Sequence, residues 1–205
     1  MSEADGRAER FSRRLNLAPL SQWEAGVSRP ASACGPAAMA ALADYWAGLA
    51  LPGSGAAESA PARINHMYER YGGRPWGMSA GGLVRGLRRY WKRHAPEGAR
   101  VFLAVFRDFE RYREEIDAGR PVAVKFDRWS ALRWRGDYAF DYHWTVGIGY
   151  EVEGKNRFLL LHDNGGRKRS GEAVPGRERR IAYEANRPVL TMVSLRIDTP
   201  ENRGV

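Results

Sequence analysis

Residues 34–49 read CGPAAMAALADYWAGL, and this stretch decides the fold of the chain. Its larger apolar side chains recur at spacings of three and four, which is the period of one helix face: Met39, Leu42, Ala43, Trp46 and Leu49. Pro36 suits the first turn of a helix, where its missing N–H leaves no hydrogen bond unmade. We therefore predict a buried helix that begins at Cys34 or just after it.

The segments that follow predict helices first and strands afterwards. A loop of small residues (51–63) leads to a short helix around 64–71, and Ser79 is a candidate cap for a third helix. From residue 100 the period becomes that of strands, with one helix over 107–119; the predicted strands are RVFLAVF (100–106), PVAVKF (121–126), HWTVGIGYEV (143–152), RFLLLHD (157–163), RRIAYEA (179–185) and PVLTMVSLRI (188–197). This order is typical of the α+β class, with a helical layer packed on an antiparallel sheet. Residues 1–14 are polar and without a period, so we expect a flexible arm followed by a single domain over 15–205.

Composition restricts the class of protein. The chain has 205 residues and a formal net charge of +9, but only four of its 33 basic residues are lysines. An excess of arginine of this kind follows from high-GC coding, so the charge alone does not favour nucleic-acid binding. A single cysteine excludes an intrachain disulfide, the sequence has no Cys/His zinc pattern, and we expect no cofactor.

Targeting segments are not predicted. No apolar run approaches the roughly 20 residues of a membrane-spanning helix, and the N-terminus lacks the apolar stretch of a secretory signal. We expect a protein of the cytoplasm, or one exported by a route that uses no secretory signal peptide.

Cys34 is the candidate nucleophile. A thiolate is favoured at the positive end of a helix dipole, and Cys34 stands where the helix is predicted to begin. The alternative interpretation is a free cysteine packed as a small hydrophobic residue.

His143 and Asp163 are the candidate base and its orienting acid. If the two strands pair about a turn centred near Glu153, Asp163 lies directly opposite His143 on one face of the sheet, with Cβ atoms about 4.5–5.5 Å apart. His162 then points to the other face. An ordinary polar cross-strand pair is the alternative, and a one-residue bulge would change the register.

Cys34, His143 and Asp163 together form the arrangement of an activated nucleophile. His143 would take the thiol proton and later protonate the leaving group, while Asp163 would orient the imidazole. The backbone N–H of Cys34 could stabilise an oxyanion. Gln22 could supply a second donor through its side-chain amide, or it could be a surface residue.

Several pieces of the sequence, taken in order, resemble the peptidase C39-like family of papain-like fold. These are LAPLSQW (17–23), CGPAAMAALADYW (34–46), EIDAGRPVAV (115–124), HWTVGIGYE (143–151) and HDNGG (162–166). Founding members of the family trim double-glycine leader peptides from bacteriocins. The resemblance implies a papain-like α+β fold with Cys34 as nucleophile, His143 as base, Asp163 as third member and Gln22 as oxyanion-hole amide.

The sequence also departs from the family. The interval between Gln22 and Cys34 is longer than usual, Asn164 could replace Asp163 if the register slips by one residue, and transporter segments are missing. Processing of leader peptides coupled to export is therefore not implied.

The expected function is that of a cysteine hydrolase, a peptidase or amidase that forms an acyl-enzyme at Cys34. Its substrate would be a peptide or protein, and the positive charge favours an acidic one. The alternatives are an acyltransferase or transglutaminase-like enzyme that uses the same triad, and a catalytically inactive basic binding module. The aromatic loop 128–142, which leads into His143, could form a wall of the substrate cleft or cover the sheet.

Overall fold

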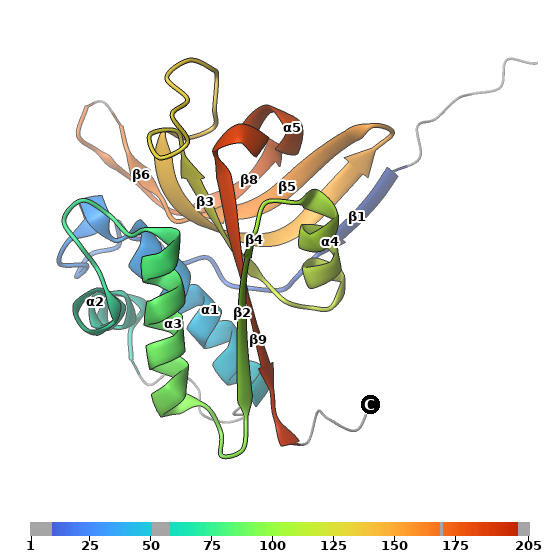
Figure 1. Ribbon diagram of the computed structural model, residues 1–205. Helices are drawn as coiled ribbons and strands as arrows, with labels where there is room; N and C mark the ends of the chain where they lie inside the picture. Colours follow the sequence, from blue (N-terminus) through green and yellow to red (C-terminus); the bar gives the residue numbers. More distant parts are fainter. Residues whose placement is uncertain (1–9, 51–57, 169, 201–205) are drawn as a thin grey trace, which may run out of the picture.

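The computed structural model describes residues 10–50, 58–168 and 170–200. Three helices, α1 (Cys34–Ala50), α2 (Ala60–Tyr71) and α3 (Ala80–His94), lie together on one side of a sheet (Figure 1). Helix α1 begins at Cys34 as predicted, and the side chain of Ser79 caps α3 by accepting a hydrogen bond from the N–H of Gly82 at 3.1 Å. Among the described residues, no helix combines the length and apolar character needed to cross a membrane.

The main sheet is antiparallel and confirms the predicted α+β class. Its strands lie in the order β2 (Arg100–Phe106), β9 (Leu190–Asp198), β3 (Val122–Asp127), β4 (Tyr142–Glu153), β5 (Asn156–Asp163) and β8 (Arg177–Ala182). A separate small hairpin joins β6 (Gly166–Arg167) to β7 (Ala173–Val174). Short helical turns cover Pro30–Ser32, Tyr183–Asn186 (α5) and Arg187–Val189.

Three segment boundaries differ from the sequence prediction. Arg10–Arg14, predicted as the end of a flexible arm, instead form β1, which pairs with the half of β4 that follows Ile148. Residues 1–9 of the predicted arm and 51–57 of the predicted loop lie outside the described residues, while α2 begins within that loop at Ala60. The predicted strand 179–185 ends at Ala182, where α5 begins.

Apolar side chains cover both faces of the sheet. On one face Trp144, Val146 and Ile148 of β4 belong to the cluster that contains the buried residues of α1, α2 and α3. On the other face lies α4 (Phe109–Asp117), whose Tyr112 is fully buried. The sheet therefore lies between α1, α2 and α3 on one face and α4 on the other (Figure 1).

A β-bulge at Ile148 exchanges the two faces of strand β4, so that side chains of the same parity point to opposite sides before and after it. The pairing of β4 with β5 shifts by one residue between Gly147 and Gly149. Ile148 packs in the cluster of α1 to α3, whereas Tyr150 beyond the bulge packs in the cluster of α4. Both glycines are needed here, because a Cβ at Gly147 would lie 2.6 Å from the ring of Tyr112, and one at Gly149 would lie 2.3 Å from a backbone carbonyl oxygen of β1.

Candidate active site

Cys34 is the first residue of α1 and is 4% exposed. A turn of 3-10 helix, Pro30–Ser32, leads into it. Gly35 packs so closely beneath the following segment that an added Cβ would lie 2.9 Å from the Cβ of Met78. The sequence Cys-Gly-Pro thus brings the loop that carries Met78 against the start of the nucleophile helix.

His143 lies near the start of β4, close to both other members of the predicted triad. Its Nε2 lies 2.8 Å from Oδ1 of Asp163, and Cys34 is near enough to raise the pKa of the imidazole. Because Nε2 faces the carboxylate, Nδ1 is the ring nitrogen left for the sulfur. His143 and Asp163 are 8% and 7% exposed, so little water competes for this contact.

The register that joins His143 to Asp163 differs from the one predicted. The hairpin turn is formed by Gly154 and Lys155, beyond the expected centre at Glu153, and Asp163 pairs with Thr145 rather than with His143. Relative to β5, His143 is therefore displaced by two residues, one full period of a strand, and it still shares a face with Asp163. Without the bulge the displacement would be three residues, and the two side chains would point to opposite faces.

The pKa values of the pair follow from their contacts. Burial lowers the pKa of His143, but hydrogen bonds to Asp163 and Cys34 outweigh burial and raise it to about 9. Burial raises the pKa of Asp163, but the bond to His143, the N–H of Gly165 at 3.1 Å and the Arg179 guanidinium at 3.4 Å hold it below its ordinary value. At neutral pH the site therefore holds an imidazolium against a carboxylate.

None of the hydrogen bonds that the described residues form joins Asn164 to His143. Its Nδ2 donates to the carbonyl oxygens of Cys34 and Trp144, each at 3.0 Å, and the residue is fully buried. This amide joins the start of α1 to β4, so it fixes the distance between the elements that carry the thiol and the imidazole. The alternative in which Asn164 faces the imidazole in place of Asp163 does not match these contacts.

Gln22 is buried beside the site, and its amide contacts the segment that precedes Cys34. Its backbone N–H donates to the carbonyl of Asn164 at 2.8 Å. Its side-chain Nε2 donates to the carbonyl of Pro30 at 2.7 Å, and within the described residues its Oε1 has no hydrogen-bond partner. The structure thus brings Gln22 next to Asn164 and Pro30, whereas none of its described hydrogen bonds reaches Cys34 or His143.

The sequence analysis missed the role of Tyr142, Trp144 and Met78. The hydroxyl of Tyr142 and the indole N–H of Trp144 both donate to the carbonyl of Met78, at 2.8 and 2.7 Å. It also missed the buried ion pair of Lys125 and Asp127 on β3, whose charged atoms are 2.5 Å apart. The lysine in the otherwise apolar run PVAVKF indicated this pair, because a lysine in a buried strand needs a partner of opposite charge.

The other histidines lie elsewhere. His162 is buried on the opposite face of β5, with Nε2 3.4 Å from Glu178, and His94 stacks on Tyr90. In the described parts of the chain, no group of three or more His, Cys, Asp or Glu side chains is arranged to hold a metal ion.

Two hollows meet at Tyr142, one on each side. The first, of about 450 Å³, is formed by the 71–79 segment, α3 and β3, and the second, of about 390 Å³, is lined by His143 and Asp163 themselves. Tyr142 lines both hollows, and the second adjoins the His143–Asp163 pair.

Comparison with known proteins identifies a family. Residues 14–189 match the family described as Peptidase_C39 like family, and the matched region includes Gln22, Cys34, His143 and Asp163. No curated protein matches the chain.

Proposed function

We propose, from the premise that this chain belongs to the peptidase C39-like family, that it is a cysteine peptidase with a Cys34–His143–Asp163 triad. Membership implies a papain-like cysteine peptidase, and the triad is the assignment added here. The observation that carries it is the position of His143, whose Nε2 lies 2.8 Å from Asp163 and whose pKa is raised by the nearby Cys34 at the first residue of α1.

In the resting site of the proposed reaction the Cys34 proton already resides on His143, as a thiolate beside an imidazolium. The thiolate attacks the carbonyl carbon of a peptide or other amide bond, and the imidazolium then protonates the leaving amine, which gives a thioester on Cys34. Water, deprotonated by His143, hydrolyses the thioester; Cys34 leaves as the thiolate and His143 keeps the proton, which restores the resting site. Asp163 keeps Nε2 bonded throughout, so that Nδ1 stays directed at the sulfur and the imidazolium is stabilised.

We propose that two hydrogen-bond donors stabilise the oxyanion. The backbone N–H of Cys34 lies at the positive end of α1. The amide of Gln22 has a second N–H besides the one given to Pro30, and we propose that a substrate carbonyl at Cys34 would receive it. Replacement of Gln22 by Glu should then lower kcat more than it changes KM.

Alkylation of the thiol tests the nucleophile directly. At about pH 6 an ordinary thiol is almost wholly protonated and reacts slowly with iodoacetamide, whereas a thiolate paired with His143 reacts fast. Because the chain has one cysteine, the gain in mass reports Cys34 alone. Fast alkylation of the native protein, lost in His143→Gln and after unfolding in urea, is the expected result; equally slow alkylation in all three would contradict the proposal.

Turnover distinguishes the remaining functions. Mass spectrometry of short peptides incubated with the protein should detect cleavage that Cys34→Ala abolishes. Products coupled to an added primary amine, with no hydrolysis, would assign the chain to the acyltransferases instead. An absence of both, together with slow alkylation, would favour a binding module.

A further inference from the structure

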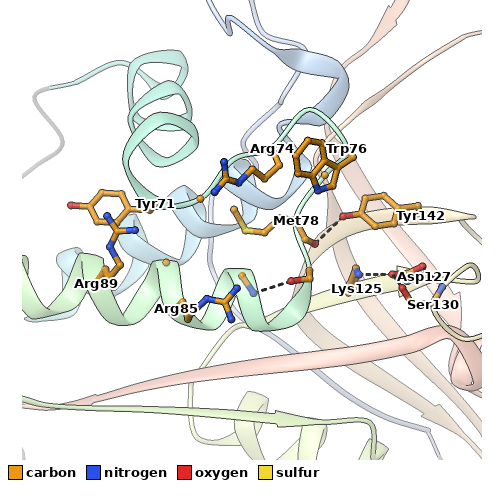
Figure 2. A pocket seen from close by; sticks show the side chains of 15 residues that line it. Tyr71, Arg74, Trp76, Met78, Arg85, Arg89, Lys125, Asp127, Ser130 and Tyr142 are labelled. Atoms are coloured by element: carbon orange, nitrogen blue, oxygen red, sulfur yellow. Dashed lines mark hydrogen bonds and ion pairs between the residues drawn. The ribbon is translucent and has the colours of Figure 1, made fainter.

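A hollow lies between α3 and β3 (Figure 2). Tyr142, which precedes His143 on β4, lines it, and so does Met78, the residue that packs on Gly35. The hydroxyl of Tyr142 donates to the carbonyl of Met78 at 2.8 Å, which joins these two lining residues. A peptide bound with its scissile carbonyl at Cys34 would therefore place a nearby side chain in this hollow.

The charge of the hollow is strongly positive. Three arginines and one lysine line it, against a single carboxylate: Arg74, Arg85, Arg89, Lys125 and Asp127. Within the described residues, no ion pair or hydrogen bond involves the guanidinium of Arg74 or that of Arg85, and both side chains are exposed. These two groups are free to bind an anion.

The one carboxylate in the hollow is already occupied. Asp127 accepts hydrogen bonds from the N–H and hydroxyl of Ser130 at 2.9 and 2.7 Å, and its Oδ2 lies 2.5 Å from Nζ of Lys125. Asp127 is therefore not available to a cationic ligand. The side chain of Lys125 is only 7% exposed and its charge offsets that of Asp127, so the excess of positive charge in the hollow comes from the arginines.

Aromatic rings complete the lining. Trp76 is 79% exposed and, like Tyr142, lines the hollow (Figure 2). An exposed indole provides an apolar surface for the methylenes of a side chain whose charged end reaches the arginines. A hollow of about 450 Å³ has ample room for one such side chain.

We propose that this hollow is a specificity subsite that receives an acidic side chain, Asp or Glu, of the peptide substrate, with Arg74 and Arg85 as its recognition residues. The inference rests on the proposed function, since it concerns the substrate of the same site. It predicts that the enzyme distinguishes substrate side chains by their charge at one position near the scissile bond.

Charge reversal at Arg85 is the sharpest test. Short quenched-fluorophore peptides carry Glu, Gln or Lys at each position in turn, and kcat/KM is measured for the native protein and for Arg85→Glu. The native protein should prefer Glu to Gln at one position by about two- to fivefold, the range expected for an exposed charge pair, and the preference should weaken as salt is added. Arg85→Glu should remove that preference and favour Lys at the same position.

Arg88→Glu is the matched control. Arg88 is an exposed arginine on the same helix that does not line the hollow, so the variant changes the net charge equally. If native protein cleaves without preference for Glu, or if the two variants shift the preference alike, the subsite is refuted while the peptidase proposal stands.

Binding separates failure of the subsite from failure of the enzyme. Fluorescence anisotropy of labelled Glu, Gln and Lys peptides is measured on Cys34→Ala, which cannot turn them over. If no peptide is cleaved and Cys34 is alkylated slowly, the proposed function fails. Tighter binding of Glu peptides, abolished by Arg85→Glu, would still support the hollow as a site for acidic peptides. Equal binding of all three peptides would refute the hollow as such a site.

Discussion

Replacement of Asp163 by Asn should lower the pKa of His143. The substitution keeps the shape of the side chain but removes the charge, while burial, which opposes the imidazolium, remains. We therefore expect the pKa to fall from about 9 toward or below the ordinary 6.5. The difference between these two values corresponds to about 3 kcal/mol of preference for the charged ring, and the hydrogen bond to Asp163 is the largest contribution that favours it.

NMR measures this pKa directly. The chain has four histidines, so labelled imidazole carbons give few signals, and the one missing in His143→Gln belongs to His143. Asp137→Asn, which removes an exposed carboxylate from the loop before β4, is the control and should leave the titration unchanged. If His143 titrates at the same pH in Asp163→Asn and in native protein, the carboxylate is not the cause of its raised pKa and the reasoning is refuted.

The same shift determines two pH dependences. A group whose pKa is raised on folding contributes stability that is complete below its unfolded value, here about 6.5, and is lost as the pH rises through about 9. The free energy of unfolding in urea should therefore fall across this interval by up to about 3 kcal/mol, and by much less in Asp163→Asn. The alkaline limb of kcat/KM should lie near pH 9 in native protein and at lower pH in the variant, because the leaving amine needs the imidazolium proton.

Three further predictions concern stability and are checked by urea unfolding. Asn164→Ala should lower the free energy of unfolding by about 2–4 kcal/mol, because two buried carbonyls lose their donor; a loss below about 1 kcal/mol would contradict its bridging role. Gly147→Ala should cost about 1–3 kcal/mol through collision with the ring of Tyr112. Gly48→Ala, within α1 and with nothing within 4 Å of an added Cβ, should instead gain about 0.5–1 kcal/mol, so equal effects of the two alanines would refute the packing argument. Tyr112→Phe should cost about 1 kcal/mol through the lost bond to the carbonyl of Gly149.

Local patterns were sufficient to predict most of the fold. The start of α1 at Cys34 depends on the spacing of its own apolar residues and on Pro36, and the cap of α3 depends on Ser79 alone. Each of these signs lies within one or two helical turns, so one sequence carries all the necessary information. The alternation of side chains along a strand likewise predicts which residues share a face of the sheet.

Features that depend on distant partners could not be predicted. β1 is exposed along its whole length and has no apolar period; ion pairs join its Arg10 to Glu151 and its Arg14 to Glu178, far away in sequence. The position of the turn and the bulge at Ile148 depend on packing against α4 and β1, so the predicted partner of His143 was wrong by two residues. His143 and Asp163 still share a face, as predicted. The later turn shifts the register by three residues and the bulge shifts it back by one, so the net shift is two residues, one full period of a strand.

The bulge in β4 also limits how this sequence can change length during evolution. Deletion of one residue between His143 and the turn would remove the bulge and move His143 to the face opposite Asp163, unless β4 lost its pairing with β5. A single insertion or deletion in the paired part of β4 beyond His143 therefore separates the two side chains, whereas the loop 128–141, which lies outside the ladder, is free to vary one residue at a time. Among homologues that keep the His–Asp pair, we expect the number of residues in the paired part of β4 beyond His143 to vary by even steps.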